Sequence, residues 1–258
     1  MTGKPEALAL ASLPLPHGFF TRQGGVSSGP FASLNCSLFG ADQAGAVQEN
    51  RARAARAIGA EPRRLVGLRQ VHGRLVQRVV DPWQEGHEPQ ADAMVTDQPG
   101  IALGIVTADC APVLFADMAA RVIGAAHAGW RGAAGGVLEA TIRAMQALGA
   151  VPERMRAAIG PAIRQTSYEV GPDLRDTVLA AAAGDDGFFA PGRSAGHWQF
   201  DLPGYCRARL ARAGLGAVAV IEADTAAEPE RFFSHRRRTL AGDGPIGHQI
   251  SLIMLPAG

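Results

Sequence analysis

The 258-residue chain has few cysteines and almost no excess of charge of either sign. Its thiols, Cys36, Cys110 and Cys206, are odd in number and widely spaced, which excludes a complete disulfide framework and predicts a reducing, cytoplasmic setting. Lys and Arg total 25 against 24 Asp and Glu, so the net charge of +1 gives no general attraction to nucleic acid or to an anionic membrane. No run reaches the roughly 18 apolar residues of a membrane span. We therefore expect neither nucleic acid nor membrane as a partner.

Hydrophobic residues make up 47% of the chain, enough for a large core, and no linker or charge block divides it. We expect one domain over residues 1–258. Apolar spacing at i, i+3, i+4 and i+7 predicts a helix over 136–148, and weaker patterns predict helices over 44–58 (with Asp42 as its cap), 172–183 and 205–213. Short, often β-branched runs predict strands over 75–80, 101–106, 112–115, 121–126, 155–159, 218–221 and 250–255. Because 101–106 is apolar on both faces, we predict a mixed α/β fold with layered sheets and outer helices.

Three residues suggest a metal site: His72 in QVHG, Cys110 in TADCAP and His127 in HAGWRG. Each follows or interrupts an apolar segment beside a Gly, Pro or small residue, which places it at a strand end, where loops build sites. Two imidazoles and a thiolate are a ligand set of catalytic zinc that leaves a fourth tetrahedral position for water. In the alternative interpretation, the histidines are hydrogen-bonded turn residues and the cysteine is a small core residue. Local sequence leaves both interpretations open.

Two glycine-rich segments carry an arginine that could bind an anion. Arg131 and the glycines of 129–136 lead into the predicted helix over 136–148, whose free N–H groups and positive dipole end favour phosphate. The alternative is a tight strand-to-helix turn with Trp130 in the core, and the Gly-Lys-Ser/Thr ending of a P-loop is absent. Arg22, beside a Gly-Gly turn in 21–27, could likewise hold an oxyanion or belong to a surface hairpin.

Two carboxylates are candidates for acid–base chemistry. Asp109 stands beside Cys110 and could act as acid or base next to a metal ligand, or simply cap a turn. Glu169, in SYEVG, has the same two interpretations. The dense basic cluster at 231–238, which includes His235, is expected to be a solvated loop rather than a nucleic-acid site, because the chain as a whole is neutral.

Taken together, these segments resemble the YfiH family, whose members are also described as multicopper polyphenol oxidase or laccase-like proteins and as peptidoglycan editing factors. The resemblance covers nearly the whole chain through FTRQGGVS (20–27), SLN (33–35), ENR (49–51), QVHG (70–73), ADA (91–93), TADCAPV (107–113), AHAGWRG (126–132), IGPAI (159–163), YEVG (168–171) and FFSHRR (232–237). The sequence departs from the family pattern at Cys36, at Asp224 and at His235, which replaces the usual tyrosine of FFSYRR. The last change puts substrate specificity in doubt, not metal binding.

The resemblance implies a layered α/β/β/α sandwich with a catalytic zinc on His72, Cys110 and His127. It also implies phosphorolysis of adenosine, inosine, guanosine and methylthioadenosine, together with adenosine deamination. The partners would then be purine nucleosides and phosphate, in a monomer or small homo-oligomer. Within this framework we assign catalytic roles to the triple Asp109, Arg131 and Glu169, and substrate-binding roles to Arg22, Asn35, Gln70 and Arg131.

Two other functions compete with this one. A copper polyphenol oxidase of the laccase type needs closely spaced histidine pairs, and no His-X-His occurs among the seven histidines. Copper is therefore disfavoured relative to zinc. A cytosolic peptidoglycan-precursor editing protein with a structural zinc is also less favoured, because closed structural sites fill all four positions with protein ligands.

Overall fold

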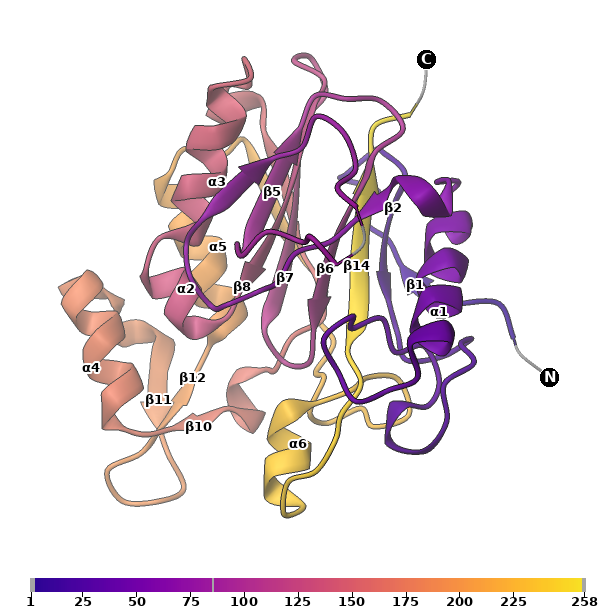
Figure 1. Cartoon of the computed structure of the whole chain (residues 1–258). Helices are drawn as coiled ribbons and strands as arrows, with labels where there is room; N and C mark the ends of the chain where they lie inside the picture. The colour runs from indigo at the N-terminus through magenta and orange to yellow at the C-terminus, as the bar shows by residue number, and fades with distance from the viewer. Residues whose placement is uncertain (1–2, 85, 257–258) are drawn as a thin grey trace.

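Two β-sheets packed face to face form the centre of the computed structural model, which describes residues 3–84 and 86–256 (Figure 1). One sheet contains, in spatial order, β13 (Ala217–Val220), β9 (Arg156–Ile159), β7 (Ala111–Asp117), β8 (Val122–Ala128), β5 (Ala93–Thr96) and β4 (Val76–Arg78). The other contains β1 (Ala7–Leu8), β2 (His17–Phe20), β14 (Gln249–Met254), β6 (Ala102–Thr107) and β3 (Leu65–Val66). Helices α3 (Val137–Gln146) and α5 (Leu202–Arg212) cover the first sheet, and α1 (Ala44–Ala57) covers the second. The predicted α/β/β/α sandwich is confirmed.

The strands of the middle layers are apolar on both faces because both faces are covered. In β7, Leu114 joins the core between the sheets, whereas its neighbours Val113 and Phe115 join the core under α3 and α5. In β6, Leu103 and Ile105 likewise face the other sheet. These runs therefore lack the alternation of a half-exposed strand, as predicted for 101–106.

The predicted helices and strands all occur, with ends that differ by a few residues. Helix α5 begins three residues early, because the Asp201 carboxylate accepts a hydrogen bond from the Gly204 N–H and caps it there. Four strands of the two large sheets, β1, β2, β3 and β5, were not predicted from the sequence. Also not predicted was a small sheet of β10 (Glu169–Val170), β12 (Trp198–Phe200) and β11 (Phe189–Pro191), which lies beside α4 (Pro172–Ala181). Short 3-10 turns lie at Gly29–Phe31, Pro62–Arg64, Pro152–Arg154, Gln165–Ser167 and Ala183–Phe188.

Two local predictions were wrong, and a third segment differs from both of its interpretations. Asp42 does not cap α1, because its Oδ2 instead accepts hydrogen bonds from Ser27 and Asn35. The segment 129–136, for which an anion site and a tight strand-to-helix turn were both open, contains the short helix α2 (Trp130–Ala134). The basic cluster is not a loop: the Ser234 hydroxyl accepts a hydrogen bond from the Arg237 N–H and begins helix α6 (His235–Leu240).

The strand order brings four separate segments to one end of the first sheet. Strands β7 and β8 are antiparallel, with Pro112 opposite His127, so the start of β7 lies beside the end of β8. Strand β5 is antiparallel to β8 and parallel to β4, so the segments leading into β4 and β5 reach the same end. Helix α6 and the small sheet lie beyond this end (Figure 1). Of the described helices, none has both the length and the apolar character of a membrane span.

Candidate metal centre and active site

The end of the first sheet brings His72, Cys110 and His127 together. Their ligand atoms, the ring nitrogens and the cysteine Sγ, all lie within 4.8 Å of one another. The two imidazole rings are 4.7 Å apart between centroids and inclined at 70°. His72 comes from the segment before β4, Cys110 from the residue before β7 and His127 from the end of β8. This geometry could hold one metal ion by two nitrogens and one sulfur.

A buried carboxylate, Asp92, orients two of the three candidate ligands. Its Oδ1 lies 2.8 Å from His127 Nδ1 and accepts the His72 backbone N–H at 2.9 Å. Its Oδ2 accepts the N–H groups of Val71 and Gly73. Because Nδ1 of His127 is held in this way, its Nε2 is left for a metal, the arrangement common for histidine ligands. The same carboxylate holds His72 in its positive-φ conformation, with φ 58°.

Two of the candidate ligand atoms lie so close to Gly129 that no side chain fits at this position. A Cβ at this position would lie 2.8 Å from His72 Nδ1 and 2.9 Å from Cys110 Sγ, closer than real Cβ atoms come. Glycine is therefore required by the close approach of the ligands rather than by its backbone angles, which are φ −69° and ψ 162°. A larger residue here would push the His72 and Cys110 ligand atoms away from their present positions.

The thiol and the imidazole of this site carry opposite charges. Burial favours the neutral thiol, but the charge and hydrogen bonds of His127 and His72 outweigh it and lower the pKa of Cys110 to about 6. Burial likewise disfavours the imidazolium, but Cys110 and Asp92 outweigh it and raise the pKa of His127 to about 9. At neutral pH the metal-free site is thus a thiolate–imidazolium pair. A thiolate is the form of cysteine that binds metals.

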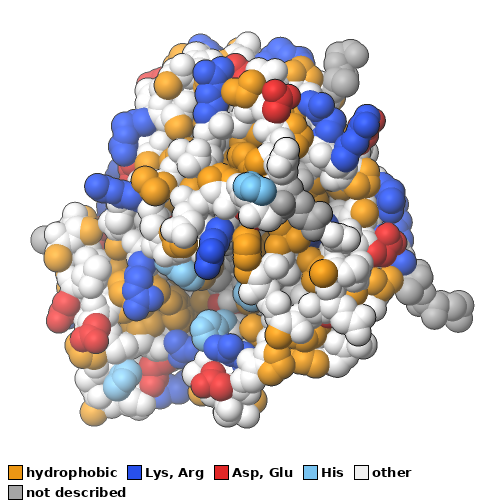
Figure 2. Space-filling view, viewed as in Figure 1, with side chains coloured by type: hydrophobic (Ala, Val, Ile, Leu, Met, Phe, Trp, Pro, Cys, Tyr) orange, Lys and Arg blue, Asp and Glu red, His pale blue; other side chains and the backbone are white. Residues whose placement is uncertain are grey.

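The donor set is open on one side. His127 is buried, Cys110 is partly buried and His72 is exposed. Figure 2 shows a hollow at this end of the sheets, with histidine and arginine side chains around it. Three protein ligands with an accessible fourth position are typical of catalytic zinc, whereas structural zinc sites are closed by four.

The surroundings add an aromatic hydroxyl and two cations. Burial, and then the Cys110 thiolate, raise the pKa of Tyr168 above its usual value, so its phenol stays protonated. Arg236 lies over the Tyr168 ring, 5.3 Å from the centroid. Arg131 stacks on Trp130 at 4.3 Å, and its guanidinium makes no hydrogen bond or ion pair to any residue that the structure describes. Arg131 therefore offers a free guanidinium fork beside the candidate ligands.

The family model described as multi-copper polyphenol oxidoreductase laccase matches residues 16–256. The chain belongs to this family, the YfiH family. A relative from Deinococcus radiodurans named purine nucleoside phosphorylase is 42% identical over 96% of this chain and 92% of its own length. One from Pseudomonas aeruginosa, also named purine nucleoside phosphorylase, is 40% identical over 86% of this chain and 88% of its own.

Solved structures of YfiH-family proteins share the whole fold. A Neisseria meningitidis protein superposes with a TM-score of 0.87 at 36% identity and covers 99% of this chain and 100% of its own. The YfiH protein of Bacillus licheniformis gives a TM-score of 0.86 at 32% identity, with 93% and 92% coverage. The layered arrangement that holds the three candidate ligands is thus the family fold.

Asp109 directly precedes Cys110, but hydrogen bonds within the chain occupy both oxygens of its carboxylate. Oδ1 accepts the Thr225 hydroxyl at 2.6 Å, and Oδ2 accepts the Ser234 hydroxyl at 2.9 Å and the Arg236 N–H at 2.6 Å. The carboxylate thereby ties the first turn of α6 to the residue before Cys110. Its backbone is held at a φ of 96°, outside the range that most residues adopt.

The other predicted site residues are also bonded within the chain. Glu169 is partly exposed, and its carboxylate accepts the Ser194 hydroxyl and the Arg193 N–H, which lower its pKa. Gln70 pairs with both backbone groups of Val106. Arg22 donates hydrogen bonds to the carbonyls of Ala32 and Pro229, and its guanidinium stacks on Phe233. The Asn35 side chain is hydrogen-bonded to Asp42, Ser37 and His248.

Sequence reasoning gave no role to Asp92 or Tyr168, although each stands in a quoted motif, ADA and YEVG. A signal for Asp92 was present: an acidic residue between two alanines at the start of a buried strand needs hydrogen-bond donors. Tyr168 offered no comparable signal, because its place beside Cys110 depends on how the small sheet packs. The glycine-rich segment 129–136 begins two residues after His127, and helix α2 uses part of its N–H groups internally, including those of Ala133 and Gly135.

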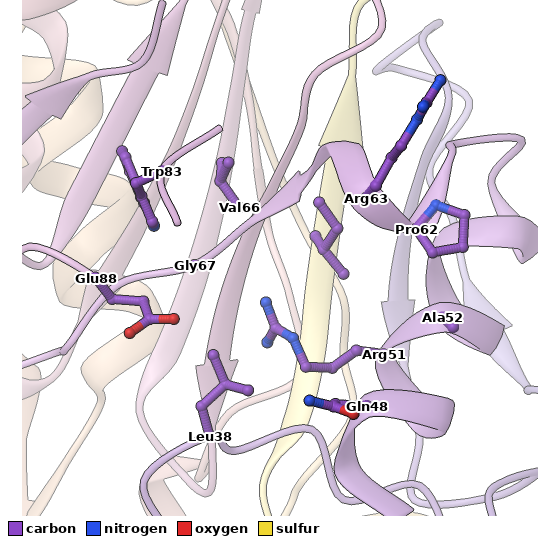
Figure 3. Close-up of a pocket in the computed structure, with 11 residues that line it drawn as sticks. Leu38, Gln48, Arg51, Ala52, Pro62, Arg63, Val66, Gly67, Trp83 and Glu88 are labelled. Carbon is purple, nitrogen blue, oxygen red and sulfur yellow. The ribbon is translucent and has the colours of Figure 1, made fainter. Parts of the chain in front are cut away.

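A separate surface groove of about 370 Å³ lies between α1 and the segments 62–67 and 83–88 (Figure 3). Arg51 and Glu88 point toward one another across it, and Trp83 forms part of its wall. No histidine or cysteine lines this groove in the part of the chain that the structure describes. We therefore place the candidate active site at the triad rather than here.

Proposed function

We propose that this chain is a zinc-dependent purine nucleoside phosphorylase. The observation that carries the proposal is the open group of two imidazoles and one thiolate, oriented by Asp92, beside the free guanidinium of Arg131. The names of the relatives, which match over most of both chains, support the same reaction. Zinc held by His72, Cys110 and His127 would supply Lewis-acid chemistry.

Phosphorolysis needs an anion site and a proton donor from the protein. An oxygen of hydrogen phosphate bonds to C1′ of the ribose while the C1′–N9 bond breaks. The purine leaves with the electron pair and takes up the proton that the hydrogen phosphate loses. Arg131 would bind the phosphate, because its fork makes paired hydrogen bonds to phosphate oxygens. Tyr168, whose phenol stays protonated, would donate a hydrogen bond to the departing purine.

The acid–base roles predicted for Asp109 and Glu169 are replaced in this proposal by positioning roles. Both carboxylates already accept hydrogen bonds from the chain, so neither has an oxygen free to exchange a proton with a nucleoside without breaking these contacts. Asp109 would keep α6 beside the Cys110 segment. Glu169 would hold the turn around Ser194.

The test incubates zinc-loaded protein with adenosine, with and without phosphate, and separates adenine, inosine and ribose 1-phosphate by chromatography. Phosphate-dependent adenine and ribose 1-phosphate in equal amounts support the proposal. The variant His72→Ala should form neither product and should no longer bind one zinc ion per chain. The matched control is His197→Ala, which removes an exposed imidazole that is far from the ligand group in sequence and hydrogen-bonds only the Ala195 carbonyl.

Two other outcomes contradict the proposal. Phosphate-independent inosine would identify adenosine deamination, the second activity that the family resemblance implies. No turnover by a protein that holds one zinc would overturn the nucleoside assignment, and peptidoglycan precursors would then be the substrates to test.

A further inference from the structure

We propose that His248 determines base specificity in this site by donating a hydrogen bond from Nε2 to the 6-oxo group of a purine. This inference rests on the proposed phosphorylase function. His248 immediately precedes β14, and Gln249, the first residue of that strand, is paired with Thr107, three residues before Cys110. The histidine thus stands at the end of the sheets where the candidate ligands lie.

The backbone of His248 is fixed by two hydrogen bonds to one neighbouring segment. Its N–H donates to Asn35 Oδ1 at 2.9 Å, and its carbonyl accepts the Cys36 N–H at 2.9 Å. The next side chain, Gln249, is bonded to both backbone groups of Phe233, two residues before α6. Because the backbone is fixed, a ligand that meets this side chain has only its two side-chain torsions to order. Asn35, predicted to bind substrate, would then act by positioning His248.

The imidazole of His248 has two unused nitrogens with different surroundings. Nδ1 is buried and has no hydrogen-bond partner among the described residues. Nε2 makes no hydrogen bond to described residues either, but it remains accessible in a partly exposed ring. A buried N–H without an acceptor is rarer in proteins than a buried acceptor without a donor. The favoured tautomer therefore keeps the lone pair on Nδ1 and the proton on Nε2, which can donate to a ligand.

The surroundings of His248 keep its ring neutral and place it near the candidate metal centre and α6. Burial, followed by His127 of the candidate metal centre and by His235 and Arg238 of α6, lowers its pKa to about 4. These groups flank it from the metal centre and from α6, the two sides of the space described above. A neutral imidazole with Nε2–H is a directional donor rather than a charge, so it suits a nucleobase edge better than a phosphate.

The two common classes of purine differ at the atom that such a donor would meet. Inosine and guanosine carry a carbonyl oxygen at C6, which accepts a hydrogen bond from Nε2–H. Adenosine carries an amino group there, which would face the donor with its own N–H. A site built to hydrogen-bond one group rejects the analogue that leaves its polar atom unpaired. The arrangement therefore predicts a preference for 6-oxopurine nucleosides.

The experiment measures kcat/KM for inosine and adenosine with the zinc-loaded wild type, His248→Phe and His248→Gln. The wild type should prefer inosine. Phe keeps a planar ring without a donor and should lower kcat/KM for inosine about threefold to tenfold, the usual effect of one neutral hydrogen bond, with little change for adenosine. Gln retains an N–H donor and should recover part of the loss. Calorimetry with hypoxanthine and adenine should show the same difference in Kd.

Zinc content and Tm, compared with those of the control His197→Phe, separate this role from a structural one. An equal loss for inosine and adenosine, or a wild type that prefers adenosine, would overturn the inference while leaving the phosphorylase proposal intact. If the wild type cleaves neither nucleoside, the proposed function fails. The hypoxanthine and adenine Kd values of the three proteins then decide whether His248 recognises the base.

Discussion

The substitution Gly129→Ala should remove metal binding while leaving the fold intact. The added Cβ would lie 2.8 Å from His72 Nδ1 and 2.9 Å from Cys110 Sγ, whereas ordinary contacts begin at 3.4 Å. One or both ligand atoms must therefore move by about half an ångström, which exceeds the tolerance of about 0.2 Å in metal–ligand distances. The φ of −69° and ψ of 162° at Gly129 suit alanine, so the backbone itself is not strained.

We expect the zinc affinity of Gly129→Ala to fall by at least about 100-fold, the upper range for losing ligand orientation alone. The affinity is measured by competition with a chromophoric chelator, and the Tm of the metal-free protein is measured alongside. The control Gly45→Ala lies in α1, where a Cβ meets nothing within 4 Å, and should raise stability by about 0.5–1 kcal/mol without affecting zinc. Wild-type zinc affinity in Gly129→Ala would show that the ion does not sit between these atoms.

Three further predictions concern the same centre. Asp92→Asn should lower zinc affinity about 10- to 100-fold and the free energy of unfolding by about 1–3 kcal/mol, because an amide N–H₂ would face backbone N–H donors. Chelator competition measures the affinity and urea unfolding the stability, and the surface variant Asp97→Asn is the control. Because the pKa of His127 is raised to about 9 and that of Cys110 is lowered to about 6, zinc binding at pH 7 should release about one proton, from His127. Zinc affinity should fall steeply below pH 6, where the thiol is protonated as well. Calorimetry in buffers of different ionisation enthalpy counts the released protons, and a count of zero would contradict the thiolate–imidazolium pair. Arg131→Gln should raise KM for phosphate about tenfold or more at unchanged zinc content, whereas the exposed control Arg143→Gln should leave KM unchanged. An unchanged KM in Arg131→Gln would show that phosphate binds elsewhere.

The fold was predictable wherever periodicity reflects burial. Helix α3 buries Val137, Thr141 and Met145 of the predicted apolar stripe and, beside them, Leu138 and Ile142. Residues 102–106 of β6 are apolar because both faces of the strand are covered. The small strands β10, β11 and β12 were missed because two or three residues carry no measurable period. The basic cluster was predicted to be a loop because its charged side chains were expected to be solvated. Ser234, directly before helix α6, is nevertheless a good N-cap residue.

The site was predictable in its ligands but less so in its supporting groups. Strand-end position and residue chemistry singled out the candidate ligand triad, but convergence depends on the antiparallel register of β7 and β8, which local sequence does not encode. Asp109 shows the converse difficulty. Its type and its place beside Cys110 suggested acid–base chemistry, yet its partners Thr225, Ser234 and Arg236 are more than 100 residues away in sequence. Only the fold shows that these donors occupy both oxygens.

The ligand inventory bears on the copper chemistry in the name of the family model. A laccase-type oxidase passes electrons between several copper ions and needs enough histidines to hold them. Among the residues that the structure describes, only the triad groups three such ligands, and its 4.8 Å spread suits a single ion. His17 bonds the backbone of Leu10 and Leu15, and His197 that of Ala195, so neither can extend the centre without breaking these contacts. A solitary, open site of two imidazoles and a thiolate is better suited to Lewis-acid chemistry on one bound substrate than to multi-electron oxidation.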